Sequence, residues 1–236
     1  MTLVAIHQPN FFPWLGYFDK IRRADVFVVL DSVQLPKTGG TWANRVKLLV
    51  SGAPAWVTVP IIRDYHGTRT ISDTEIDNRP PWRAKLLKTI ELNYRRAPHF
   101  DGVFPWLADL IADSADKIAD YNANAIKAIT KALRIDSTRL VMASRTDADG
   151  QATALLISIV RAVGGNAYLA GGGATGYQDD AMFSDAGLDL QHQDFQHPVY
   201  RQFNSATFVP GLSIVDALMN CGFEGTSDLL NQGRIE

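Results

Sequence analysis

Three side chains that can exchange protons or hydrogen bonds lie close together near the start of the chain. His7, Gln8 and Asn10 follow a short apolar run at residues 3–6 and are separated by Pro9. Imidazole titrates near neutral pH, so His7 is a candidate catalytic acid or base. The two amides can donate hydrogen bonds to an anion or to a developing oxyanion. The alternative is structural, with His7 only bonding a loop carbonyl, but the clustering predicts the floor of an active site.

An amphipathic helix is predicted directly after this loop. Free N–H groups at a helix N-terminus attract anions, so the helix adds a second polar element to the same place. Trp14 could stack on a planar ligand, although packing in the core explains an aromatic residue there equally well. Lys20 lies on the same helix and is a candidate substrate-binding residue.

A second cluster of polar residues follows a predicted buried strand at residues 26–30. Asp31 is a candidate catalytic residue, because it could orient His7 or Lys20 or hold magnesium together with phosphates. Among the residues of this loop, Arg45 is best suited to bind a phosphate or carboxylate through paired hydrogen bonds. A solvated surface loop is the alternative. The candidate substrate-binding residues of this loop are Gln34, Lys37, Asn44 and Arg45.

A run of glycines ends another predicted strand, at residues 167–170. Gly171, Gly172 and Gly173 would let backbone N–H groups come close to a bound ligand. Their spacing matches neither the dinucleotide-binding fingerprint nor a P-loop, and a tight turn explains them equally well. Tyr177, just beyond, could donate its hydroxyl to a substrate.

Two further pairs are candidate substrate contacts. Ser144 and Arg145 follow a predicted strand at residues 139–143, where they could contact a phosphate. Tyr200 and Gln202 lie on one face of the chain if the segment is extended. Both pairs therefore join the predicted site.

A metal site is not expected. His192 and His197 are five positions apart with Asp194 between them, and on a strand this spacing points the two imidazoles to opposite faces. Cys221 is the only cysteine, which rules out an intrachain disulfide and argues against a cysteine-rich zinc site.

Composition narrows the class of protein. The chain has 236 residues, 46% of them hydrophobic, which is enough for one large core. Its net charge of −2 argues against nucleic-acid binding through a basic face. No apolar run is long enough to cross a membrane, and the first residues do not resemble a signal peptide. We expect a soluble cytoplasmic protein.

Strands that alternate with helices predict an α/β fold with a mostly parallel sheet. Residues 56–62 and 70–76 are predicted strands joined by a hairpin loop, and residues 82–133 form a helical subdomain inserted into the α/β domain. We expect residues 1–222 to make a single domain and residues 223–236 to be a polar, poorly ordered tail. The other predicted elements are strands at 26–30, 139–143, 167–170 and 188–190 and helices at 151–163 and 212–219.

The same segments resemble one protein family. Residues 7–21, 24–34 and 42–45 are similar to the WbqC-like protein family, and so are 168–171 and 200–222. The resemblance covers nearly the whole chain. It implies a role in the biosynthesis of O-antigen lipopolysaccharide and related polysaccharides or secondary metabolites, with glycyl or other aminoacyl transfer as the suggested reaction.

The leading hypothesis is transfer of an acyl or aminoacyl group to a small metabolite, such as a nucleotide-linked sugar. His7 would be the base, and Lys37 and Arg45 would hold a phosphate or carboxylate of the substrate. Two alternatives stay open: a ligase or nucleotidyltransferase that uses ATP with magnesium, and a non-catalytic partner of a biosynthetic complex. Outside the ATP alternative, the cofactor is left open.

Overall fold

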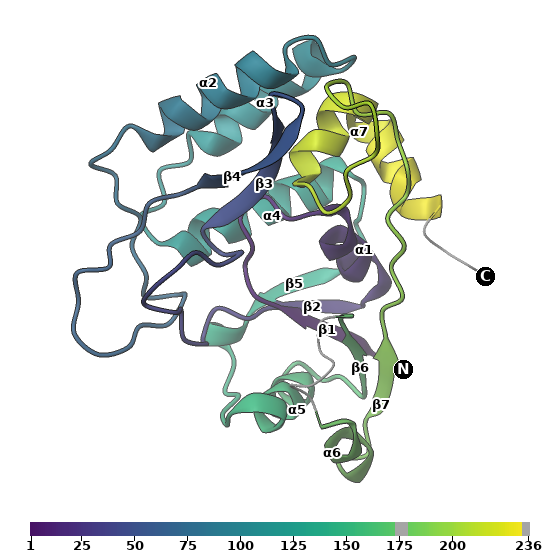
Figure 1. The fold of residues 1–236 in the computed structure, drawn as a ribbon. Coiled ribbons are helices and arrows are strands. Elements are labelled where there is room, and N and C mark those ends of the chain that lie inside the picture. The colour runs from purple at the N-terminus through teal and green to yellow at the C-terminus, as the bar shows by residue number, and fades with distance from the viewer. Residues whose placement is uncertain (173–178, 233–236) are drawn as a thin grey trace.

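Five parallel strands form the central sheet of the computed structural model, which describes residues 1–172 and 179–232 (Figure 1). The order across the sheet is β5-β2-β1-β6-β7. Strands that alternate with helices pair in parallel, because each helix carries the chain back to the same edge of the sheet. The predicted α/β class is confirmed. The strands are β1 (Leu3–His7), β2 (Val26–Val29), β5 (Arg139–Met142), β6 (Ala167–Ala170) and β7 (Asp189–His192).

Helices cover both faces of this sheet (Figure 1). On β1, Ala5 packs in one apolar cluster with Phe18 of α1, whereas Val4 packs in the other with Val160 of α5. Successive side chains of a strand point to opposite faces, so an uninterrupted apolar strand needs helices on both sides. The helices concerned are α1 (Leu15–Arg23) and α7 (Ile214–Gln232) on one face, and α5 (Ala152–Ala162) and α6 (Asp180–Asp185) on the other.

A long insertion separates β2 from β5. It begins with an antiparallel hairpin and continues as three helices, which lie beside α7 above the sheet in Figure 1. The three helices occupy the region where the sequence predicts a helical insertion. The elements are β3 (Arg45–Val50), β4 (Ala53–Thr58), α2 (Trp82–Tyr94), α3 (Phe100–Ile111) and α4 (Ile118–Ala132).

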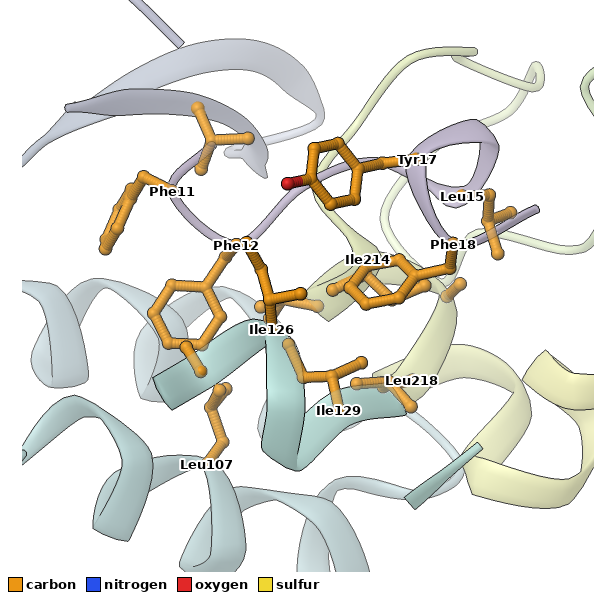
Figure 2. Packing of buried hydrophobic residues seen from close by; sticks show 14 of the residues in the cluster. Phe11, Phe12, Leu15, Tyr17, Phe18, Leu107, Ile126, Ile129, Ile214 and Leu218 are labelled. Carbon is orange, nitrogen blue, oxygen red and sulfur yellow. The ribbon is translucent and has the colours of Figure 1, made fainter. Parts of the chain in front are cut away.

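The loop after β1 is anchored in the main apolar core. Phe11 and Phe12 are almost fully buried and point toward the helices of the insertion (Figure 2). Phe12 lies near Leu107 of α3 and Ile126 of α4 in the same cluster. The two rings therefore hold the polar part of the loop against a rigid support.

Two predicted strands differ in the structure. Residues 70–76 form a turn with isolated bridges, because Thr70 and Thr74 bond locally: Thr74 Oγ1 donates to the Thr70 carbonyl at 2.8 Å. The strand predicted at 56–62 lies earlier, as β4. The hairpin partner β3 is not predicted, since its charged residues suggest a loop.

The prediction of a poorly ordered tail is wrong as far as Gln232. Helix α7 kinks at Gly222, where φ is 70°, and a second helical segment follows, in which Thr226 Oγ1 donates to the Gly222 carbonyl at 2.6 Å. Leu229 and Leu230 bury their side chains in the main core. Apolar burial therefore fixes a segment whose composition is largely polar. Among residues 1–172 and 179–232, no helix has the length and apolarity that crossing a membrane requires.

Candidate functional site

A cavity of about 500 Å³ lies where the direction of the sheet connections reverses. Strands β1 and β6 are neighbours, but β1 leads through α1 to β2 on one side and β6 leads through α6 to β7 on the other. The carboxyl ends of such neighbouring strands leave a crevice that open α/β sheets use for ligands. The cavity is lined by His7, Asn10, Trp14, Gly16, Tyr17, Lys20, Trp42, Gly171, Gly172, Gln193, Asp194, Phe195, His197 and Gly211.

Lys20 is a buried amine in the lining of this cavity. It comes from α1, is 2% exposed, and its Nζ donates to the Ile6 carbonyl at 2.9 Å. Its Nζ lies 5.8 Å from the centre of the Tyr168 ring. Burial disfavours the charged form and lowers the pKa of Lys20 from 10.5 to about 7. A neutral amine is therefore available at physiological pH.

His7 stands next to this amine at the end of β1. Its ring meets Tyr17 edge to face, with centroids 4.8 Å apart, and Nδ1 lies 3.3 Å from the Gln8 carbonyl oxygen. Burial, and then the charge of Lys20, lower the pKa of His7 from 6.5 to about 3. His7 is therefore neutral at pH 7, which suits hydrogen bonding to a ligand better than taking a proton.

The loop that follows His7 is held by contacts from distant parts of the chain. Phe12 has φ of 38°, a conformation that bulky side chains rarely adopt. Ser213 Oγ donates to the Phe12 carbonyl at 2.7 Å, and Asn122 Nδ2 donates to the Pro9 carbonyl at 2.8 Å. Such over-determined strain is found at sites whose geometry must be fixed before a ligand binds.

An aromatic wall of the cavity is made of Trp14, at the end of this loop, and of Phe195 and His197, which follow β7. The Trp14 ring lies 5.6 Å from Phe195 and 5.4 Å from His197, measured between centroids. Gln193 Nε2 donates to the Gly16 carbonyl and to Asp19 Oδ2, both at 2.8 Å, and so attaches this segment to α1. The segment after β7 is therefore part of the site. Sequence reasoning considered it only for metal binding, although a polar and aromatic run after a strand is the signal that indicates it.

Gly16 leaves room for this wall. A Cβ added at Gly16 would lie 1.9 Å from the Trp14 ring, whereas a Cβ at Gly102, in the first turn of α3, would meet nothing within 4 Å. Helix propensity favours Gly102→Ala by up to about 1 kcal/mol. We expect Gly16→Ala instead to lower the free energy of unfolding by about 1–3 kcal/mol, because Trp14 must move. Denaturant unfolding of both variants checks this, and equal stabilisation would contradict the tight packing.

Six of the predicted site residues meet at the cavity. They come from the end of β1 and the loop after it, from α1 and from the segment after β6, and they are His7, Asn10, Trp14, Lys20, Gly171 and Gly172. Gln8 is not among the lining residues, and its carbonyl accepts from the Tyr17 hydroxyl at 3.0 Å. Gly173 and Tyr177 lie outside the described residues.

Asp31 does not line the cavity and instead forms hydrogen bonds with Ser144. The Ser144 backbone N–H donates to Asp31 Oδ1 at 2.9 Å, and the Ser144 hydroxyl donates to Oδ2 at 2.5 Å. Both carboxylate oxygens thus bind the turn after β5, the strand beside β2. Arg145 follows on this turn and is exposed. This arrangement indicates that Asp31 joins the end of β2 to the end of β5.

Tyr200 and Gln202 lie together, but at a buried carboxylate. The Tyr200 hydroxyl donates to Asp216 Oδ2 at 2.7 Å, and Gln202 Nε2 donates to the same oxygen at 3.1 Å. Asn44 also has internal partners, since its Nδ2 donates to the Val59 carbonyl at 3.2 Å. None of the three is among the residues that line the cavity.

The remaining candidates lie on the outer surface of the insertion. Lys37 Nζ donates to the Tyr65 carbonyl at 2.7 Å, and the Arg45 guanidinium stacks on Trp56. Gln34 is exposed and pairs with Thr70 in an isolated bridge. Across residues 1–172 and 179–232, no group of three or more histidine, cysteine or acidic side chains could hold a metal ion.

The structure is that of an α/β protein with a cavity at the switch point of a parallel sheet. A model of the WbqC-like protein family matches residues 8–228, and the chain belongs to this family. It is 32% identical over 228 residues to Rv1507c, an uncharacterized protein of Mycobacterium tuberculosis, with 95% of this chain and 96% of that protein covered. No solved structure matches the chain.

Proposed function

We propose that this protein is a transferase that moves an acyl or aminoacyl group from an activated donor to the amine of a small metabolite. The observation that carries the proposal is the buried Lys20 amine beside His7 in the cavity. A lysine with a pKa near 7 can accept a proton at physiological pH, which an exposed lysine cannot do. Membership of the WbqC-like family supports a biosynthetic role.

The reaction needs a proton acceptor and a donor with a leaving group. The acceptor amine attacks the carbonyl carbon of a thioester or ester, the new C–N bond forms, and the bond to the leaving thiolate or alkoxide breaks. Lys20 takes the proton that the amine loses and returns it to the leaving group, so the enzyme ends as it began. In this proposal Asn10, which lines the cavity, donates a hydrogen bond to the oxyanion.

His7 has a binding role in this proposal, not the role of base that the sequence suggested. Its pKa of about 3 makes it a weak proton acceptor at pH 7, whereas Lys20 is poised at that pH. A neutral imidazole can still accept or donate a hydrogen bond to the acceptor amine and orient it.

The test measures N-acylated product and released thiol by mass spectrometry, with acyl and aminoacyl thioesters as donors and nucleotide-linked amino sugars as acceptors. Because Lys20 must be neutral, we expect kcat/KM to rise with pH through about 7 and then level off. His7→Gln should lower kcat/KM without moving this inflection. An inflection that disappears in His7→Gln but persists in Lys20→Met would reverse the two roles.

The ligase alternative predicts a different dependence. Product formation that requires ATP and magnesium and releases AMP or ADP would replace the transferase proposal. Incubation of the protein with ATP, magnesium, a free amino acid and the same acceptors distinguishes the two. In the transferase proposal, this mixture gives no product and ATP is not consumed.

A further inference from the structure

A pair of exposed tryptophans continues from the cavity onto the outer face of the β3–β4 hairpin. Trp42 lines the cavity, and its ring meets Trp56 of β4 with centroids 5.1 Å apart. Each of the two residues is 42% exposed. Tryptophans are costly to leave in water and are enriched where proteins bind ligands and partners. The pair marks a surface next to the candidate site.

Two cations share this face of the hairpin. Lys47 lies directly opposite Trp56 in the strand register, and Arg45 is two positions away on the same strand. Val46 and Leu48 alternate with them and are 1% exposed. Because side chains alternate along a strand, the apolar residues face the core and the cations face outward with the tryptophan.

Both cations are held against the Trp56 ring. The Arg45 guanidinium carbon lies 4.3 Å from the ring centre, and Lys47 Nζ lies 5.1 Å from it. In the part of the chain that the structure describes, neither cation forms an ion pair with a carboxylate. In a chain with a net charge of −2, two adjacent cations without acidic partners are a local anion-attracting feature.

The surface is fixed to the rim of the cavity. The Ser213 N–H donates to the Lys47 carbonyl at 2.9 Å, and Ser213 also pairs with Trp14 of the aromatic wall. On the other side, a Cβ at Gly40 would lie 2.5 Å from Arg45 Cδ, so the loop over Arg45 fits the arginine closely. These contacts hold the backbone of β3, which carries both cations, beside the rim of the cavity.

We propose that this platform, made of Trp42, Arg45, Lys47 and Trp56, binds a nucleoside diphosphate. The two cations neutralise the diphosphate, and the exposed indole rings supply a stacking surface for the base. The amine-bearing group attached to the diphosphate then enters the cavity next to Lys20. This last step rests on the proposed acyl transfer, whereas the binding of a nucleoside diphosphate does not.

Isothermal titration calorimetry of the full chain with UDP, dTDP, CDP, GDP and ADP tests the platform. We expect at least one of them to bind, and we expect Trp56→Leu and the double variant Arg45→Gln/Lys47→Gln each to weaken binding at least about tenfold. Lys88→Gln, on the exposed side of α2, is the matched charge control and should bind as the wild type does. Circular dichroism melting shows that each variant is folded.

Two further measurements separate the platform from the transferase. Lys20→Met should bind the nucleoside diphosphate within about twofold of the wild type while losing acyl transfer. Pyrophosphate should bind more weakly than the nucleoside diphosphate, and Trp56→Leu should weaken its binding less than it weakens that of the nucleotide. The platform is overturned if none of the five nucleotides binds at millimolar concentration, if the hairpin variants bind normally, or if pyrophosphate binds as tightly as the best nucleotide.

Discussion

Replacing Lys20 with methionine should stabilise the protein at pH 7 and abolish acyl transfer. Burial lowers the pKa of Lys20 from 10.5 to about 7, so the folded protein holds this amine at a cost of roughly 3–5 kcal/mol. Methionine fills a similar volume without a charge. It leaves the Ile6 carbonyl without its donor, which costs about 1–3 kcal/mol. We expect a net gain of about 1–3 kcal/mol in the free energy of unfolding.

The gain in the free energy of unfolding from Lys20→Met should fall as the pH rises. The folded-state pKa of Lys20 lies below that of the unfolded chain, so the unfolded chain binds more protons between pH 7 and 10.5. Stability of the wild type therefore rises with pH through this window. The advantage of Lys20→Met should shrink by about 1.4 kcal/mol per pH unit over the same window and reverse at about pH 8–9. Urea denaturation at pH 7, 8.5 and 10 measures it.

Lys88→Met is the control for this experiment. Lys88 lies on α2, and its Nζ pairs with Glu91 at 3.0 Å on the surface, where such pairs contribute about 0–1 kcal/mol. Its substitution should change stability little at any pH. If Lys20→Met destabilised the protein at every pH, the lysine would be a structural donor to the Ile6 carbonyl, and its role as proton acceptor would be refuted.

The sequence predicts the part of the site that is local in the chain. His7, Asn10, Trp14 and Lys20 lie within fourteen positions of one another, and one strand, one loop and one helix bring them together. The rule that strand ends meet at one edge of a parallel sheet also brings Gly171 to this edge, where it lines the cavity. The depth of Lys20 is not predictable in this way, because it depends on how α1 packs against β1 and β6.

The parts that the sequence misplaces depend on long-range pairing. Asp31 follows a buried strand as His7 does, but β5 adds to the sheet beside β2 and brings Ser144 to it from 113 positions away. Tyr200 and Gln202 have polar side chains of the kind that contact ligands, yet both donate hydrogen bonds to the Asp216 carboxylate on α7. Residue type and spacing give no means of choosing between a ligand and a distant side chain as partner.

Asp216 should be the most sensitive position for stability outside the apolar core. Its carboxylate is fully buried and accepts three hydrogen bonds, from the Tyr94 hydroxyl at 2.9 Å and from Tyr200 and Gln202. Asp216→Ala removes the acceptor of all three donors, of which only Gln202 Nε2 keeps another, the Val209 carbonyl, and it opens space between them. We expect it to lower the free energy of unfolding by about 3–5 kcal/mol, as measured by guanidinium denaturation.

The geometry of the acceptor, not its charge, supplies this stability. Burial raises the pKa of Asp216, and the bonds from Tyr200, Tyr94 and Gln202 oppose that rise only in part. Asp216→Asn keeps an oxygen for two of the donors and turns an amide toward the third, Tyr94, whose hydroxyl oxygen can accept from it as well as from Leu49 N–H. We therefore expect Asp216→Asn to cost only about 1–2 kcal/mol.

Tyr200→Phe completes the comparison, because it removes a single donor and leaves the carboxylate two others. Its expected cost is about 1–2 kcal/mol, well below that of Asp216→Ala. Equal costs for Asp216→Ala and Asp216→Asn would show that the three donors do not depend on an acceptor. Asp216 is also connected to the candidate site. Its N–H donates to the Ser213 carbonyl, and Ser213 Oγ donates to the carbonyl of Phe12, whose backbone is strained. A loss of order at Asp216 should therefore reach the loop that follows His7.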